Sequence, residues 1–232
     1  LRRTRVGTAE RCVRVATVEL DGQPPGRGVE VFDLQGEGCR VDGLERIVHG
    51  KVEVSALAGG RTDGAGRALT EQIDYECELA VVIGHSAKNV KRADAMQFVA
   101  GYTIANDYAI RDYLENWYRP NLRVKNRDGC TALGPWLVDA ADLPDPQALG
   151  LRTFVNGELK QHGNTRDLID DVPALIEYLS RFMTLSPGDL ILTGTPEGVV
   201  NVNPGDEVVC EIDGLGRLLN TIVADDPNMQ GH

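Results

Sequence analysis

One stretch of the chain changes from polar to apolar within a few residues, and it constrains the fold more than any other. Residues 74–84 read DYECELAVVIG, a polar start that leads into a continuous apolar run closed by a glycine. Such a run is typical of a β-strand that enters a buried core. Because side chains two positions apart on a strand point to the same face, Glu76 and Glu78 should stand side by side, opposite Cys77.

The two glutamates at the start of this strand allow two interpretations. Two carboxylates held close together at the mouth of a core resist ionising together, and a bound cation removes that conflict. Alternatively, the acidic strand end is simply solvated and binds nothing. Taken alone, residues 74–84 favour the solvated strand end slightly, so the metal hypothesis has to be supported by the rest of the chain.

The length and charge of the chain exclude several classes of protein. Its 232 residues suit one large domain, or a small lobe and a main domain. The formal net charge of −11 argues against nucleic-acid and anionic-membrane partners, which require basic surfaces. No apolar run approaches the roughly 20 residues that span a bilayer. The basic start LRRTR has no apolar segment after it, so we expect no secretory signal.

Cysteine usage indicates a reducing compartment. The five cysteines are far apart, and none belongs to a C-x-x-C pair. A disulfide framework or a zinc site is therefore not expected, and the cytoplasm is the predicted location. The chain also lacks the glycine-rich phosphate-binding motifs, so no nucleotide cofactor is expected.

Strand-like segments outnumber helical ones along the chain. Weak alternation predicts a small antiparallel hairpin or meander within residues 12–34, with a turn at 23–27. Asn156-Gly157 between two apolar runs predicts another hairpin. Two Pro-Gly-Asp turns precede predicted strands at 190–193 and 208–212, and a last strand is expected near 218–223. Apolar spacing predicts helices over 93–102 and 172–183. These elements indicate a β-rich α+β fold with a few inserted helices.

A glycine-dense segment, residues 59–66, suggests a division of the chain. We expect a small N-terminal β lobe over residues 1–58 and a flexible glycine-rich connection over 59–73. A catalytic, metal-binding domain then covers residues 74–224, and a tail covers 225–232.

Asp107 is the best candidate for a third metal ligand, because the chain can return beside the first strand after the intervening helix. Three carboxylates form an all-oxygen site, which suits Mg²⁺ or Mn²⁺ better than zinc. Arg111 follows Asp107 by one helical turn and would share its face if that segment is helical. Lys125 is a second cation in the same basic, aromatic stretch, residues 108–127. That stretch is either a basic surface that balances the negative charge of the rest of the chain or the wall of a pocket for an anionic substrate.

Several of these segments together resemble the fumarylacetoacetate hydrolase family. They are the stretch DYECELAVVIG, the run GYTIANDYAIRD at 101–112, GNT at 163–165, FMTL at 182–185 and PGD with TGTPEG between 187 and 198. The resemblance covers residues 74–224 in the order of the family. Residues 107–116 and 118–125 look most like the isomerase/decarboxylase branch of the homoprotocatechuate pathway, which acts on 5-oxopent-3-ene-1,2,5-tricarboxylate and 2-hydroxyhepta-2,4-diene-1,7-dioate.

The resemblance implies a particular fold and metal site. It implies a mixed β-roll or pseudo-barrel, like the C-terminal domain of fumarylacetoacetase, in a homodimer. It also implies that Glu76, Glu78 and Asp107 hold Mg²⁺, with Mn²⁺ as a possible substitute.

The resemblance further implies roles toward a small anionic 2-oxo acid substrate. Lys125 would be the catalytic cation, and Arg111 and Thr195 would bind substrate carboxylates. Arg119 and Arg123 are further candidates for binding the distal carboxylates. Gln161 and Asn164 fall in a family segment, but no role is assigned to them.

The implied activity is Mg²⁺-dependent decarboxylation or isomerisation of an unsaturated 2-oxo or 2-hydroxydienoic polycarboxylic acid in aromatic catabolism. An acylpyruvate hydrolase or an oxaloacetate decarboxylase of the same family is the alternative, and a non-catalytic metal-binding paralogue is another. The chain departs from the family in one respect: the Asn-Tyr-x-x-His-x-x-Glu segment that supplies a general acid/base pair is not found. His49 and Glu53 have the wrong spacing for it, and hydrolysis, which needs an activated water, is the less favoured reaction.

Overall fold

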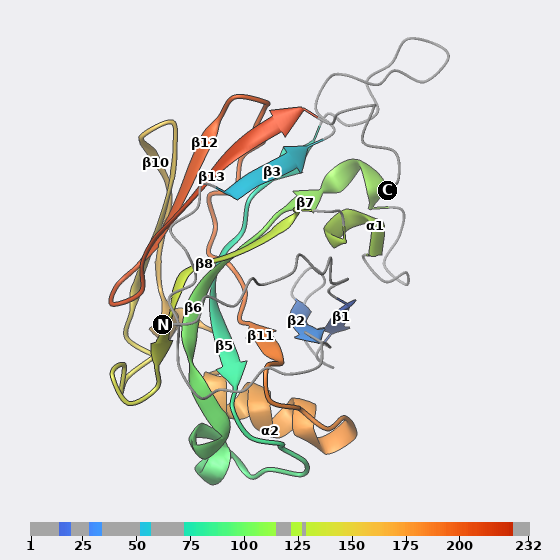
Figure 1. The fold of residues 1–232 in the computed structure, drawn as a ribbon, viewed down its shortest axis with the longest axis vertical. Helices are drawn as coiled ribbons and strands as arrows, with labels where there is room; N and C mark the ends of the chain where they lie inside the picture. Colours follow the sequence, from blue (N-terminus) through green and yellow to red (C-terminus); the bar gives the residue numbers. More distant parts are fainter. Residues whose placement is uncertain are drawn as a thin grey trace, which may run out of the picture.

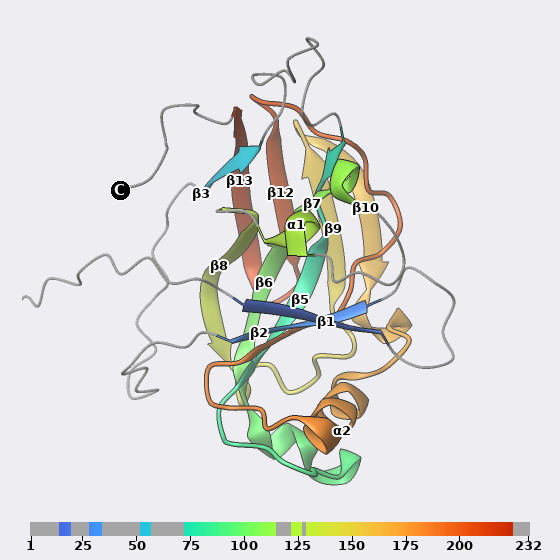
Figure 2. The same ribbon diagram turned by 90° about the vertical axis from the view of Figure 1, so that its right-hand side faces the viewer.

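Two large β-sheets, a two-stranded ladder and a few short helices are the regular elements in the part of the chain that the structure describes. The structure is a computed structural model that describes residues 14–19, 28–33, 52–56, 72–114, 122–126 and 129–224. Figures 1 and 2 show the sheets as two layers, with the longest helix, residues 172–182, at one end. The predicted β-rich fold with few helices is confirmed.

The larger sheet has six strands, and all its neighbours pair antiparallel. In spatial order its strands are β1 (Arg14–Glu19), β2 (Gly28–Asp33), β11 (Leu190–Leu192), β5 (Cys77–Ile83), β6 (Val99–Asp107) and β8 (Thr131–Asp139). The second sheet, in spatial order, has β10 (Glu158–Asn164), β9 (Gly150–Val155), β12 (Glu207–Ile212), β13 (Gly216–Ala224) and β3 (Val52–Ala56). Only the β13–β3 pair of this sheet is parallel. A short ladder joins β4 (Ile73–Asp74) to β7 (Ala109–Ile110).

Strand β5 explains why the two sheets pack together. Its odd-numbered side chains, from Cys77 to Ile83, are wholly buried in the main core with residues of β9 and β12. The other face of β5 carries Glu78 and Ala80, and Ala80 packs against Leu190 and Leu192 of β11. The predicted strand is confirmed, as is the placement of Cys77 opposite the glutamates.

Helix α2 (Val172–Phe182) confirms the helix expected over 172–183. The Asp171 side chain accepts a hydrogen bond of 2.9 Å from the Ala174 N–H, so it caps the helix as its position suggests. Figure 1 shows α2 at one end of the molecule, beside the 3₁₀-helix η1 (Arg92–Phe98). The other short helices are η2 (Arg111–Tyr113), α1 (Leu122–Lys125) and η3 (Thr165–Asp167).

The helix predicted over 93–102 is wrong in type and in its end. Residues Arg92–Phe98 form 3₁₀ turns, and Val99 already begins β6. The spacing of Ala95, Met96 and Val99 suits a helix, but residues from Val99 onward pair with β5. Pairing with the central strand therefore overrides the local pattern.

The hairpins expected from the sequence are confirmed. Asn156 and Gly157 both have positive φ, 51° and 83°, and they join β9 to β10. Such a pair matches the twist of the flanking strands. At the N-terminal side, β1 pairs with β2, while the turn expected at 23–27 lies outside the described residues.

The division of the chain into a lobe and a main domain stays a prediction. Strand β2 pairs with β11, and β3 pairs with β13, so segments of the expected N-terminal lobe extend both sheets. Residues 57–71 and 225–232, which include most of the expected connection and the whole tail, lie outside the described residues. Among the described residues, no helix is long and apolar enough to cross a bilayer.

Candidate metal centre

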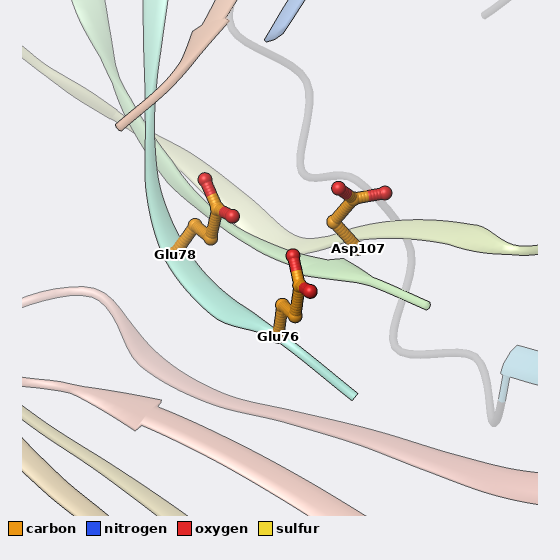
Figure 3. Close-up of side chains that lie close together, drawn as sticks. All are labelled: Glu76, Glu78 and Asp107. Atoms are coloured by element: carbon orange, nitrogen blue, oxygen red, sulfur yellow. The ribbon is translucent and has the colours of Figure 1, made fainter. Parts of the chain in front are cut away.

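Three carboxylates meet where β5 begins and β6 ends. The β5–β6 register pairs Cys77 with Asn106 and Glu78 with Ala105, and the Asp107 N–H donates to the Glu76 carbonyl over 2.9 Å. This register brings the side chains of Glu76, Glu78 and Asp107 to one face, with one oxygen of each within 4.8 Å of the others. Figure 3 shows the three carboxylates gathered above these strands. The structure therefore brings together the three residues that the sequence singled out as metal ligands.

Lys125 lies directly against two of these carboxylates. Its Nζ donates to Glu76 Oε2 over 2.6 Å and to Asp107 Oδ2 over 2.7 Å, and it reaches the Asp107 carbonyl at 3.2 Å. The Lys125 side chain is 6% exposed. Helix α1, which ends at Lys125, therefore carries a buried ammonium into the acidic cluster.

Arg111 bridges Glu76 to a fourth carboxylate, Asp74. Its Nε donates to Asp74 Oδ2 over 2.9 Å, and its Nη2 donates to Glu76 Oε1. The helical condition under which Arg111 would share the face of Asp107 is not met, because Asp107 ends β6 and Arg111 begins η2 after the short strand β7. Arg111 reaches the cluster through η2 instead, where its N–H donates to the Gln72 carbonyl.

Glu78 is held by a backbone donor and lies in the buried part of the cluster. Its Oε2 accepts a hydrogen bond of 2.6 Å from the Gly194 N–H. Burial raises the pKa of the Glu78 carboxyl well above its ordinary value, and the charges of Asp107 and Glu76 raise it further. Burial also raises the pKa of Asp74, and the Arg111 guanidinium opposes that shift. The cluster thus has an electrostatic conflict that a cation would relieve.

The charge of the cluster fits a divalent cation. When ionised, the four carboxylates Asp74, Glu76, Glu78 and Asp107 carry twice the charge of the two cations, Arg111 and Lys125. Among these side chains, two negative charges are left, which one divalent ion neutralises. All the potential ligand atoms of the triad are oxygen, the donor type that Mg²⁺ and Mn²⁺ prefer.

Thr195 lies on the turn that contacts Glu78. Gly194 N–H binds Glu78, and the next residue, Thr195, has its Oγ1 2.8 Å from the buried Gln161 Nε2. Asn164, by contrast, accepts from the Arg166 N–H and caps η3, which is ordinary turn chemistry.

Of the remaining candidates, Arg119 and the side chain of Arg123 lie outside what the structure describes. His85 and His162 are exposed, and the acidic cluster identified among the described residues contains no histidine. His49 lies outside the described residues, so the missing acid/base pair is not located.

Sequence reasoning missed two contributors to the site. Asp74 lies two residues before Glu76. The same two-residue spacing that placed Glu76 and Glu78 on one face could have predicted that Asp74 belongs to the site. The Gly194 N–H could not be predicted, because the order of residue types does not indicate which backbone N–H donates to a site.

Comparison with known proteins identifies the family. The profile of the fumarylacetoacetate (FAA) hydrolase C-terminal family matches residues 48–223. The chain belongs to the fumarylacetoacetate hydrolase family. The resemblance stated from the sequence motifs is thereby confirmed.

Relatives of this family member include enzymes of aromatic degradation. The 4-hydroxyphenylacetate degradation bifunctional isomerase/decarboxylase of Salmonella dublin is 64% identical over 156 residues, which are 67% of this chain. The match spans only 36% of the length of that relative. The close similarity therefore concerns about a third of the length of that relative.

Solved structures of the family share the fold. The 2-hydroxyhepta-2,4-diene-1,7-dioate isomerase of Mycobacterium marinum has a TM-score of 0.64 and 40% identity, covering 78% of this chain and 64% of its own. The fumarylpyruvate hydrolase of Pseudomonas aeruginosa, solved with Mn²⁺ and pyruvate, has a TM-score of 0.68 and 31% identity, covering 77% and 73%. The structure of that hydrolase thus contains a divalent cation, and the acidic triad of this chain has the composition to hold one.

Proposed function

We propose that the protein is a metal-dependent decarboxylase/isomerase of an unsaturated 2-oxo or 2-hydroxydienoic polycarboxylic acid in aromatic catabolism. The observation that carries the proposal is the meeting of Glu76, Glu78 and Asp107 within 4.8 Å. The 64% identity to a bifunctional isomerase/decarboxylase supports the reaction type. We further propose that the two sheets form the family's β-roll and that the chain acts as a homodimer, for which sedimentation at twice the chain mass is the test.

The acidic triad is proposed to hold Mg²⁺, or Mn²⁺ in its place. When bound, the divalent ion supplies Lewis acidity to the oxygens of a 2-oxo acid, where negative charge grows as CO₂ leaves or a proton moves along the diene. Glu76 and Asp107 would be kept in position by Lys125, and Glu78 by the Gly194 N–H.

Three side chains are proposed to act on the substrate. Lys125 holds a buried positive charge beside two of the ligands, so it stabilises negative charge that develops nearby without having to reorganise. Arg111 and Thr195 flank the triad, and their donors suit the carboxylates of a substrate with several negative charges.

The experiment is a spectrophotometric assay with 5-oxopent-3-ene-1,2,5-tricarboxylate. We expect its absorbance to fall in the presence of Mg²⁺ and the rate to vanish with EDTA and in Glu76→Ala. The exposed Glu197→Ala serves as the matched control and should keep the wild-type rate.

The products and the alternative substrates separate the competing functions. Pyruvate released from an acylpyruvate would indicate the hydrolase, and CO₂ from oxaloacetate would indicate the other decarboxylase. Metal binding without turnover of any of these acids would indicate a non-catalytic paralogue and refute the proposal.

A further inference from the structure

Gln161 occupies the centre of a buried hydrogen-bond network behind the Thr195 turn. It lies on β10 and is wholly buried. Its Nε2 donates to Thr195 Oγ1 over 2.8 Å and to the Pro196 carbonyl over 2.7 Å. Its Oε1 accepts from the hydroxyl of Thr153, its cross-strand partner on β9, over 2.7 Å. The amide thus uses both of its N–H donors and its oxygen.

The partners of Gln161 fix which end of the amide faces the turn. The Pro196 carbonyl can only accept, so the nitrogen of the amide must point toward residues 195–196. The Thr153 hydroxyl can then donate to the amide oxygen. The orientation follows from the chemistry of the partners and not from the similar shapes of oxygen and nitrogen.

This orientation determines what the Thr195 hydroxyl can do. Because Thr195 Oγ1 accepts from Gln161, its own proton remains to be donated elsewhere. Among the residues that the structure describes, no acceptor for that proton is recorded. Thr195 is partly exposed, whereas Gln161 behind it is not. The hydroxyl is therefore held as a donor.

The same turn is fastened to the acidic triad. The Gly194 N–H donates to Glu78 Oε2, and the Thr193 hydroxyl donates to the Leu79 carbonyl over 3.0 Å. On the other side, Gly163 lets Pro196 approach β10, because a Cβ at position 163 would lie 2.9 Å from the Pro196 Cβ. Thr195 is thus held between the strand that carries Glu78 and the strand that carries Gln161.

We propose that Gln161 is a positioning residue that directs the Thr195 hydroxyl proton toward an anionic substrate oxygen. The group that accepts this proton from Thr195 would be the carboxylate of a 2-oxo acid bound beside Glu78. Gln161 does not touch the substrate and acts only through Thr195. The inference rests on the proposed function, because it takes the acidic triad to be the place where a 2-oxo acid binds.

The test measures ligand binding and not turnover, with Mn²⁺ and oxalate as the probes. Calorimetry gives the Kd of Mn²⁺, and then the Kd of oxalate at saturating Mn²⁺, for the wild type, Gln161→Met, Thr195→Val and the double variant. Methionine keeps the length of glutamine without its donors, and valine keeps the shape of threonine without its hydroxyl. Thr153→Val is the matched control, because it removes a buried bond from the same network and leaves both Nε2 donors in place.

The expected result is a non-additive loss of oxalate affinity. A hydrogen bond to a charged group corresponds to about tenfold or more in affinity, so Thr195→Val should weaken oxalate binding by at least that factor. Gln161→Met should weaken it to a similar degree, and the double variant should be no weaker than Thr195→Val alone. Thr153→Val should lower Tm and leave the oxalate Kd within about twofold, and the Kd of Mn²⁺ should change little in all variants.

Two results would overturn the positioning role. One is normal oxalate binding by Gln161→Met, and the other is a double variant whose loss is the product of the two single losses. A Tm for each variant shows that it is folded, and Thr195→Ser, which restores the hydroxyl, should recover oxalate binding. A wild type that binds no Mn²⁺ would refute the proposed function together with this inference, whereas intact Mn²⁺ binding with unchanged variants would refute this inference alone.

Discussion

Replacing Lys125 with methionine should separate stability, metal affinity and catalysis in one variant. The Nζ of Lys125 lies 2.6 Å from Glu76 Oε2 and 2.7 Å from Asp107 Oδ2, and its side chain is 6% exposed. Removing one partner of a buried ion pair costs about 3–5 kcal/mol, so the metal-free variant should lose about 3 kcal/mol of unfolding free energy. Methionine retains the length of the side chain, so the loss comes mainly from the charge.

The same variant should bind Mn²⁺ more tightly than the wild type. The ammonium and a divalent ion repel each other, and at an effective dielectric constant near 20 and a separation of 4 Å this repulsion is about 8 kcal/mol, twice that of two unit charges. Even a fraction of that corresponds to about tenfold in affinity. Catalysis should nevertheless fall by about 100-fold or more, because a preorganised charge beside the reacting oxygens is lost.

Urea unfolding with and without Mn²⁺, together with calorimetry and the absorbance assay, provides the measurements. Lys88→Met, which removes an exposed lysine, is the control and should change none of the three quantities appreciably. The reasoning is refuted if Lys125→Met is as stable as the wild type, or if it binds Mn²⁺ more weakly.

Three further predictions follow from the same contacts. Because the pKa of Glu78 is raised in the folded state, the metal-free protein should lose unfolding free energy as pH rises from the ordinary glutamate pKa to the raised folded-state value. Over the same pH window the affinity for Mn²⁺ should rise, because the ligand loses its proton. Urea unfolding against pH checks the first effect, and calorimetry against pH checks the second. Asp74→Asn should weaken the hold on Arg111 and raise KM several-fold with little change in the Kd of Mn²⁺, since Asp74 accepts from the Arg111 Nε; an equal loss of Mn²⁺ binding would contradict this. Gly198→Ala should destabilise the protein by more than about 2 kcal/mol in urea unfolding, because its φ is +107° and a Cβ would lie 2.2 Å from the Lys160 carbonyl.

The triad could be predicted from sequence because a strand has a fixed two-residue period. That period put Glu76 and Glu78 on one face, and the antiparallel return of the chain put Asp107 beside them. A helical segment would have placed Arg111 on the face of Asp107, whereas Arg111 reaches Glu76 after a short strand and within a 3₁₀ turn. The charged residues of the site could thus be identified from their residue types, although the local backbone conformation at Arg111 could not.

The parts that sequence reasoning missed depend on partners distant along the chain. Strand β8 was not among the predicted elements; Pro135 lies within it and is tolerated because β8 stands at the end of the described order of its sheet. The strand start at Val99 depends on pairing with β5, and the contacts of Gln161 are made to a turn more than thirty residues later. Local patterns do not record such long-range pairing.

The central claim, that Glu76, Glu78 and Asp107 form a metal centre, is tested most directly by anomalous diffraction from crystals soaked in Mn²⁺. The account predicts one strong anomalous peak among these three carboxylates, and no peak there in crystals of Glu78→Gln. A Mn²⁺-soaked wild type without density at the triad, and with Lys125 still joining Glu76 to Asp107 as in the present arrangement, would contradict it.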